Sequence, residues 1–211
     1  MHFDVADLCI QFFCLIFSLS VHEAAHAVMA NRCGDPTARL LGRASLNPMA
    51  HIDPIGLAAV FLIGFGWGKP VQYNPYNLKW PKWGPVAVAV AGPMSNVLLG
   101  ILSIVLIKVF GQLLGVNNLL TIFLFLSAQL NLLLLVFNLI PLPPLDGSKV
   151  LLAILAHPQY DKVRIFIEMR GPFILLCVIL FDTFLNLGIF SSLGALITQF
   201  VIQSSGLSAF L

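Results

Sequence analysis

Residues 8–31 read LCIQFFCLIFSLSVHEAAHAVMAN, an apolar run that His22, Glu23 and His26 interrupt near its end. A transmembrane helix needs about 20 consecutive apolar residues, and this run is long enough to form one. Residues four apart lie one above the other on a helix, so both imidazoles can reach one metal ion. Two histidines and a glutamate at membrane depth cost free energy unless something satisfies them, which favours a functional site over a polar patch bonded to a neighbouring helix.

The composition of the whole chain points to the same environment. Of its 211 residues, 59% are hydrophobic and only 9% are charged, and the mean hydropathy is +0.95. A soluble domain carries about 25% charged residues, because its surface must face water. The composition therefore excludes an ordinary soluble domain, a disordered chain and a nucleic-acid-binding protein, and it predicts an integral membrane protein.

The apolar segments predict an all-α polytopic membrane protein with about four to five transmembrane helices. Three segments are clear spans, and a fourth is long enough for one helix and a shorter one, with a bend at residues 188–192. In order, they cover residues 8–31, 84–110, 119–145 and 171–202. Asp182 in the fourth segment is unfavourable in lipid, so we expect it to face protein or an interface. We expect residues 1–211 to form a single intramembrane domain, with a catalytic core at about 8–150 and C-terminal membrane segments at about 171–203.

A shorter apolar segment, residues 54–67, contains three glycines and suits a re-entrant or interfacial segment better than a span. If it does not cross the membrane, 10 of the 11 basic residues share one side and Lys108 stands alone opposite. If it crosses, the basic residues divide four against seven across the membrane, and the four are Arg32, Arg39, Arg43 and Lys108. The positive-inside rule favours the first arrangement, with the N-terminus outside and the basic loops cytoplasmic.

Two stretches near this segment are expected to form short β-strands at the cytoplasmic face. Residues 37–46 read TARLLGRASL and partly alternate polar and apolar side chains, and residues 71–73 are similar. Asp53 followed by Pro54 is a favourable helix start, with aspartate as the N-cap and proline at the first helical position. The expected fold therefore includes a short re-entrant and β element at this face.

A third metal ligand is expected at the end of the third long segment, because a catalytic zinc site takes three protein ligands and leaves one position open. Residues 138–147 read NLIPLPPLDG, and three prolines in four residues cannot continue a helix. Taken alone, Asp146 is better explained as the cap of a helix at residues 148–157. Topology favours a ligand, because the arrangement with most basic residues on one side puts Asp146 at the same face as His22 and His26.

HEAAH in a first transmembrane helix, together with NLIPLPPLDG in a later one, resembles the site-2 protease family of intramembrane zinc metalloproteases. The Gly-Pro-x-x-Asn element of that family is matched by residues 92–96, which read GPMSN. Residues 47–56 and 65–71 also resemble the compact members of the family, which have no PDZ or CBS domains. The resemblance extends from residue 22 to residue 147, over half of the chain.

This resemblance implies the residues of a site. One zinc ion per chain would be bound by His22, His26 and Asp146, and Glu23 would act as the general base. Asn138 matches a family asparagine that helps to position substrate or stabilise the oxyanion, although an interhelical hydrogen bond explains it equally well.

Other polar residues of the matched elements have simpler explanations. Asn96, with Gly92 and Pro93, is better explained by packing and interhelical bonding than by chemistry. His51 and Asp53 could form a pair behind the metal ligands or supply an extra ligand. An interfacial histidine before an N-cap aspartate is the commoner case.

The implied function is that of a zinc-dependent intramembrane endopeptidase, which cleaves peptide bonds within or beside transmembrane segments. Its partners would be a transmembrane protein or peptide substrate and the lipid bilayer, without nucleic acid. Glu23 would take the proton of a zinc-activated water and deliver it to the leaving amine, on the cytoplasmic side. The alternative is a membrane metal-binding protein or divalent metal transporter, which needs a continuous polar path, and beyond Asp182 the sequence offers few intramembrane ionisable groups.

Overall fold

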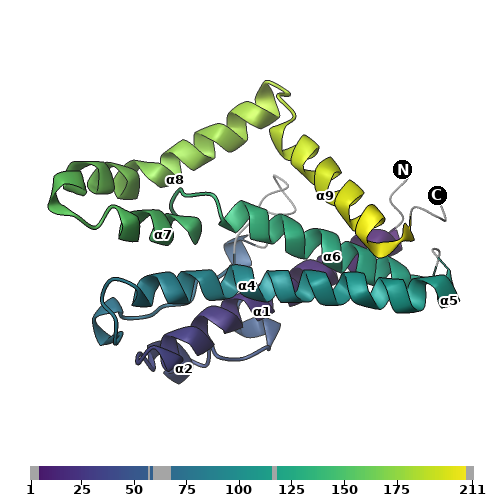
Figure 1. The fold of residues 1–211 in the computed structure, drawn as a ribbon, viewed down its shortest axis with the longest axis horizontal. Helices are drawn as coiled ribbons and strands as arrows, with labels where there is room; N and C mark the ends of the chain where they lie inside the picture. Colours follow the sequence, from purple (N-terminus) through teal and green to yellow (C-terminus); the bar gives the residue numbers. More distant parts are fainter. Residues whose placement is uncertain (1–4, 57, 59–67, 116–117, 208–211) are drawn as a thin grey trace. The chain divides into compact units, whose positions relative to one another are not determined.

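The computed structural model describes residues 5–56, 58, 68–115 and 118–207 (Figure 1). This part of the chain is helical and has no β-sheet, which confirms the all-α prediction; its one β-bridge joins Ile52 and Gly68. The longer helices are α1 (Val5–Arg32), α4 (Gly84–Leu106), α6 (Leu119–Asn138), α8 (Asp161–Phe184) and α9 (Ile189–Ser205). The shorter ones are α2 (Thr37–Leu40), α5 (Gln112–Leu114), α7 (Gly147–Ile154), η1 (Pro48–Ala50), η2 (Pro75–Asn77), η4 (Pro158–Tyr160) and the π-helical η3 (Ile107–Gly111).

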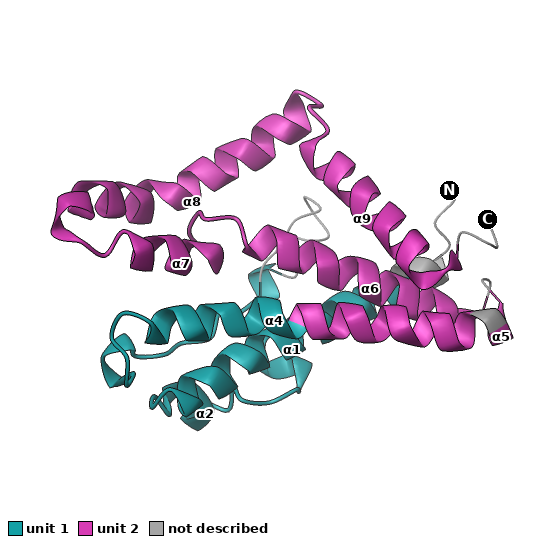
Figure 2. Cartoon of the chain, in the orientation of Figure 1, with its two compact units in different colours: residues 1–95 teal, residues 96–211 magenta. Residues whose placement is uncertain are grey.

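The chain divides into two compact units, Met1–Ser95 and Asn96–Leu211, and the division falls within α4 (Figure 2). The first unit holds α1, α2 and the start of α4, and the second holds the rest of α4 and the helices that follow. The first unit has a buried cluster of Ala30, Cys33, Leu78 and Val88, which packs the end of α1 against the start of α4. In the second unit, α6 packs against α9 through Ala128, Ile197 and Val201.

Three of the described helical segments are long and apolar enough to cross a membrane: Cys9–Arg32, Gly84–Gly111 and Leu119–Asn138. α8 and α9 pass the same test only as a pair, and the two are bent by 84° at the break between them. Counting the bent pair as one span gives four, the lower end of the predicted range.

The bend in the last apolar segment lies between α8 and α9, slightly earlier than the predicted residues 188–192. Asn186 and Gly188 have positive φ angles of 50° and 74°. Asp182 is buried, and its two carboxylate oxygens accept the backbone N–H groups of Ile189 at 2.7 Å and Phe190 at 3.2 Å. Of the two expected surroundings for Asp182, protein or an interface, the structure shows protein, because the buried carboxylate caps the first turn of α9.

The third spanning helix, α6, ends at Asn138 rather than at the predicted residue 145. Pro141, Pro143 and Pro144 follow within six residues. A proline has no N–H to donate to the helix, and the residue before it is pushed out of the helical region. Residues 139–146 therefore form consecutive turns, which place Asp146 at the start of α7.

The predicted β-strands are wrong. Residues 37–40 form the short helix α2, and residues 71–73 have no regular secondary structure. Asp35 accepts hydrogen bonds from the Thr37 N–H and hydroxyl groups at 3.3 and 2.6 Å, and Ala38 is fully buried. These contacts favour a helical turn, which the alternation of polar and apolar side chains does not reveal.

The predicted re-entrant segment lies mostly outside the described residues, which omit 57 and 59–67. Its start is described. Pro54–Gly56 is helical, and Asp53 Oδ1 accepts the N–H groups of Ile55 at 2.9 Å and Gly56 at 3.4 Å. The predicted N-cap role of Asp53 is thus confirmed.

Candidate active site

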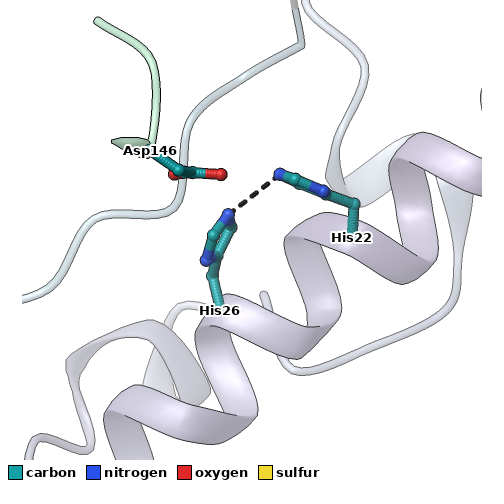
Figure 3. Close-up of side chains that lie close together, drawn as sticks. All are labelled: His22, His26 and Asp146. Carbon is teal, nitrogen blue, oxygen red and sulfur yellow. Dashed lines mark hydrogen bonds between the residues drawn. The ribbon is translucent and has the colours of Figure 1, made fainter. Parts of the chain in front are cut away.

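The HEAAH motif lies in α1, and its two histidines are 4% and 7% exposed. Their side chains point toward one another, with His22 Nε2 and His26 Nε2 3.0 Å apart (Figure 3). The two rings are nearly perpendicular, with an interplanar angle of 86°. One turn of helix therefore brings two imidazole nitrogens to one point, as the spacing predicts.

The second nitrogen of His26 is occupied by the backbone. His26 Nδ1 lies 2.7 Å from the carbonyl oxygen of Val88 in α4, and a carbonyl can only accept a hydrogen bond. Nδ1 therefore carries the proton, and Nε2 of the neutral ring keeps its lone pair. Metal-binding histidines typically donate their other ring N–H in this way, so the donor set fits a divalent ion such as zinc.

Gly92 provides the space in which the two imidazoles meet. A Cβ atom at this position would overlap His26 Nε2 and would lie 2.6 Å from both His22 Cε1 and His22 Nε2. Only a residue without a side chain can bring α4 this close to the histidine pair. Sequence reasoning assigned Gly92 to packing and missed this role. The GPMSN element carried the signal, since a glycine matched to a family motif can mark such a close approach.

The candidate base, Glu23, is partly buried on α1 between the two histidines. Its Oε2 accepts the backbone N–H of Val71 at 3.2 Å. This hydrogen bond fixes the carboxylate and joins α1 to the stretch after Gly68. Gly68 itself is confined, because a Cβ there would lie 2.9 Å from Leu19 Cδ2 of α1 and 3.2 Å from the His51 carbonyl oxygen.

Asp146, also labelled in Figure 3, belongs to the second unit and stands directly before α7. Although it occupies the N-cap position, its side chain makes no capping hydrogen bond to α7. The simpler explanation, that Asp146 is present as a helix cap, therefore loses its support.

The turns around Asp146 are closely packed within the second unit. A Cβ on Gly147 would overlap the Leu139 carbonyl and would lie 2.7 Å from the Ile140 carbonyl oxygen. A Cβ on Gly171 of α8 would lie 2.5 Å from Cδ of Pro143. These two glycines allow the end of α6, the proline turns and α8 to pack in contact, which fixes the backbone that carries Asp146.

Asn138 is the last residue of α6, and its Nδ2 donates to the Leu134 carbonyl oxygen of the same helix at 3.0 Å. This bond lies within one helix, whereas the simpler explanation invoked a bond between two helices. Asn96 in α4 is fully buried, in line with a packing role.

His51 is 1% exposed, and its Nε2 lies 2.7 Å from the Ser45 carbonyl oxygen. Its ring closes the turn that contains η1, and Asp53 caps the helix that follows. The commoner explanation of this pair, a structural histidine before an N-cap, matches these contacts.

A helical chain with several candidate membrane spans and an imidazole pair arranged for a metal ion has the features of a membrane metalloprotein. The family model of peptidase family M50 matches residues 107–179 of the chain. This region includes Asn138 and Asp146.

Three relatives carry names of the same kind. The Bacillus subtilis protein "Putative zinc metalloprotease YwhC" is 42% identical over 142 residues, which cover 65% of this chain and 65% of that protein. "Putative zinc metalloprotease Rip2" of Mycolicibacterium smegmatis is 27% identical over 200 residues, covering 93% of this chain and 74% of Rip2. "Zinc metalloprotease MJ0392" of Methanocaldococcus jannaschii is 28% identical over 147 residues, covering 70% of this chain and 34% of that protein. The chain therefore covers slightly less than two thirds of YwhC, and no solved structure matches it.

Proposed function

We propose that this chain is a zinc-dependent intramembrane endopeptidase that cleaves peptide bonds within or beside transmembrane segments of membrane proteins. One observation carries the proposal: two imidazole Nε2 atoms lie 3.0 Å apart on a helix long enough to cross a membrane. The Val88 carbonyl occupies the other nitrogen of His26, and Glu23 lies between the two histidines. The match to the model of peptidase family M50 over residues 107–179 supports the same reaction class.

His22, His26 and Asp146 are the residues proposed to hold the zinc ion, one per chain. Two neutral imidazoles and a carboxylate form a common ligand set for a catalytic zinc, which polarises a carbonyl group and lowers the pKa of water when bound. The absence of a capping bond from Asp146 to α7 supports its assignment. So does the distribution of basic residues, which favours a topology with all three ligands at one membrane face.

Glu23 is proposed to move the proton during hydrolysis. The oxygen of a water molecule adds to the scissile carbonyl carbon, and the carbon–nitrogen bond then breaks. Glu23 accepts a proton from the water and passes it to the leaving nitrogen, so the products are a carboxylic acid and an amine. The Val71 N–H, 3.2 Å from Oε2, holds the carboxylate in place for this transfer.

Asn138 is proposed to position the substrate or to stabilise its carbonyl oxygen, on the strength of its match to the family asparagine. In this structure, Nδ2 donates to the Leu134 carbonyl. A substrate oxygen that approaches from the side of the proline turns would compete for that donor. The substrate must also unwind locally, because helical hydrogen bonds hide its carbonyl groups.

The function is tested by zinc content and cleavage of purified protein, measured together on the wild type, Asp146→Ala and Glu23→Gln. We expect about one zinc per chain in the wild type and in Glu23→Gln, and a strong loss in Asp146→Ala. Cleavage of a panel of single-span test proteins is expected to fall at least about 100-fold in Glu23→Gln, since a general base contributes about that much or more.

Asp161→Ala is the matched control, because the Asp161 side chain is exposed and pairs with the nearby Arg164 at 3.4 Å. It should keep both zinc and cleavage. An equal zinc content in Asp146→Ala and the wild type would show that Asp146 is not a ligand. It would then favour the alternative function, a metal transporter. Substantial cleavage by Glu23→Gln would refute the base assignment.

A further inference from the structure

The loop that leads into α4 exposes an unusual set of side chains. Residues 76–83 read YNLKWPKW, and we call them the aromatic–lysine loop. Tyr76 is 96% exposed, Trp80 57% and Trp83 55%. Lys79 and Lys82 are exposed as well, and Lys82 Nζ lies 5.3 Å from the ring centroid of Trp83. Large aromatic rings are normally kept from water, so this exposure calls for a contact outside the chain.

The loop is held firmly to the ends of two helices. Leu78 is its one buried residue and packs with Ala30, Cys33 and Val88. The Lys79 N–H donates to the Cys33 carbonyl oxygen at 2.8 Å. The exposed rings and lysines are therefore presented by a fixed backbone, which reduces the entropy lost when they bind a partner.

A second set of bonds fixes the approach to the loop and keeps the nearest acidic side chain away from solvent. Asp35 is fully buried, and its carboxylate accepts the Asn74 N–H at 2.6 Å and Asn77 Nδ2 at 2.9 Å. Asp35 is the only acidic residue between Glu23 and Asp53, and none occurs from residue 54 to residue 145. The exposed charge around the loop is therefore positive. Arg32 at the end of α1 and Arg39 in α2 are also exposed and add to it.

The position of the loop along the chain identifies the partner. The candidate spans Cys9–Arg32 and Gly84–Gly111 both have an end here, and Leu78 and Lys79 tie those two ends together. The loop therefore stands where two helices leave the hydrocarbon of a bilayer. Tryptophan and tyrosine favour this interface, because one edge of the ring is polar and the body is apolar. Lysines at the same depth face the phosphate groups of lipids.

We propose that the aromatic–lysine loop is a binding surface for anionic phospholipids, in which Lys79 and Lys82 contact the headgroup phosphate and Trp80 and Trp83 contact the glycerol and upper acyl region. Charge complementarity favours anionic over zwitterionic lipid. An acidic peptide could also satisfy the lysines, but it would not account for three exposed aromatic rings beside the end of a span. The proposal does not depend on the peptidase activity.

The test measures the binding of phosphatidylglycerol and phosphatidylcholine to the full-length, delipidated protein by native mass spectrometry. The wild type is expected to prefer phosphatidylglycerol, with a preference that falls as salt is added. In Lys79→Gln/Lys82→Gln, the Kd for phosphatidylglycerol should rise about fivefold for each lysine removed, because each contributes about 1 kcal/mol near an anionic surface. The Kd for phosphatidylcholine should change little.

Two further variants separate charge from aromatic contact. Trp80→Leu/Trp83→Leu should weaken the binding of both lipids alike and leave the ratio of their Kd values unchanged, since the rings do not distinguish headgroup charge. Lys108→Gln, which removes an exposed lysine near the far end of the same span, should keep the wild-type ratio. The proposal is overturned if the double lysine variant keeps the wild-type ratio, if Lys108→Gln lowers it equally, or if glycerol 3-phosphate competes as well as the lipid, which would make the loop a simple phosphate site.

Discussion

At the scale of single residues, the histidine pair takes its geometry from two groups that carry no reactive side chain. The Val88 carbonyl selects the tautomer of His26, and Gly92 leaves the volume in which the two rings meet. The motif HEAAH supplies the candidate ligands, but α4 decides which nitrogen of His26 is available to a metal ion. Mutation of residues that orient a metal ligand without binding the metal commonly lowers metal affinity by about 10–100-fold.

Gly92→Ala should therefore weaken zinc binding by about tenfold or more, because the new methyl group would overlap both imidazoles. Gly100→Ala is the matched control on the same helix. A Cβ there meets Leu132 Cδ2 at 3.4 Å, an ordinary contact. Zinc affinity measured by competition with a chelator should fall in the first variant and not in the second. Unchanged affinity in Gly92→Ala would show that α4 does not confine the pair.

A second residue-scale prediction concerns Asp35, which lies beyond the end of α1. Burial alone would raise the pKa of its carboxyl, but hydrogen bonds from Thr37, Asn77 and Asn74 outweigh burial and lower it below the ordinary value. The unfolded chain therefore binds a proton at a higher pH than the folded chain does. The stability from Asp35 is present above about pH 4 and is lost as the pH falls through the lowered pKa.

Asp35→Ala should lower the free energy of unfolding by about 1–3 kcal/mol at neutral pH, because it leaves buried donors without an acceptor. Thermal unfolding of the purified protein at several pH values checks this. The difference between variant and wild type should shrink in acid, when the wild-type carboxylate becomes protonated. A difference independent of pH would mean that packing, not the charge, provides the stability.

At the scale of elements, the break between α8 and α9 depends on one carboxylate. Asp182 accepts two N–H groups from the first turn of α9. These donors would otherwise have no partner in an apolar setting, where an unsatisfied N–H costs several kcal/mol in lipid. The acidic residue that hydropathy marks as out of place is therefore what allows the chain to turn by 84°.

Asp182→Ala should destabilise the protein by about 1–3 kcal/mol, and Asp182→Asn should have a smaller effect because its oxygen can still accept one bond. Asp161→Ala, at the exposed start of α8, should change stability by less than about 0.5 kcal/mol. Thermal unfolding in detergent measures the relative stability of the three variants. If Asp182→Ala were as stable as Asp161→Ala, the carboxylate would not be needed for the bend.

At the scale of the whole molecule, the direction in which the chain crosses the membrane can be tested on a single span. The span Gly84–Gly111 has 28 residues, which correspond to about 42 Å of helix, more than the hydrocarbon thickness of about 30 Å. Lys82 and Lys108 therefore lie near opposite ends of one span. The distribution of basic residues predicts that Lys82 is cytoplasmic and Lys108 is outside.

Single cysteines in a cysteine-free background test this orientation. Lys82→Cys should react with a membrane-impermeant thiol reagent only from the cytoplasmic side, and Lys108→Cys only from the outside. Labelling in intact cells and in inverted vesicles distinguishes the two faces. The reverse pattern would place the candidate active site at the outer face, and labelling of both positions from one side would mean that the segment does not cross.

The local chemistry could be predicted from the sequence because it depends on short-range periodicity and on the cost of polar groups in lipid. HEAAH on one face of an apolar helix, the Asp53 cap and the protein-facing Asp182 follow from these rules. The strand prediction at residues 37–46 failed because the contacts that decide the local structure there do not follow from periodicity. The helix α2 is stabilised by Asp35 and by the burial of Ala38, and neither contact can be read from alternation.

What the sequence by itself determined is the all-helical membrane class, the three principal spans and the identity of the candidate ligands and base, since each depends on residue type and spacing along the chain. Only the tertiary structure decided that the Val88 carbonyl holds His26, that Gly92 must be a glycine and that Val71 holds Glu23. These contacts join positions 48 to 70 residues apart, and two of them run through backbone groups. The GPMSN element signals Gly92, but no pattern of side chains marks the Val88 and Val71 contacts, which become visible only when the chain is folded.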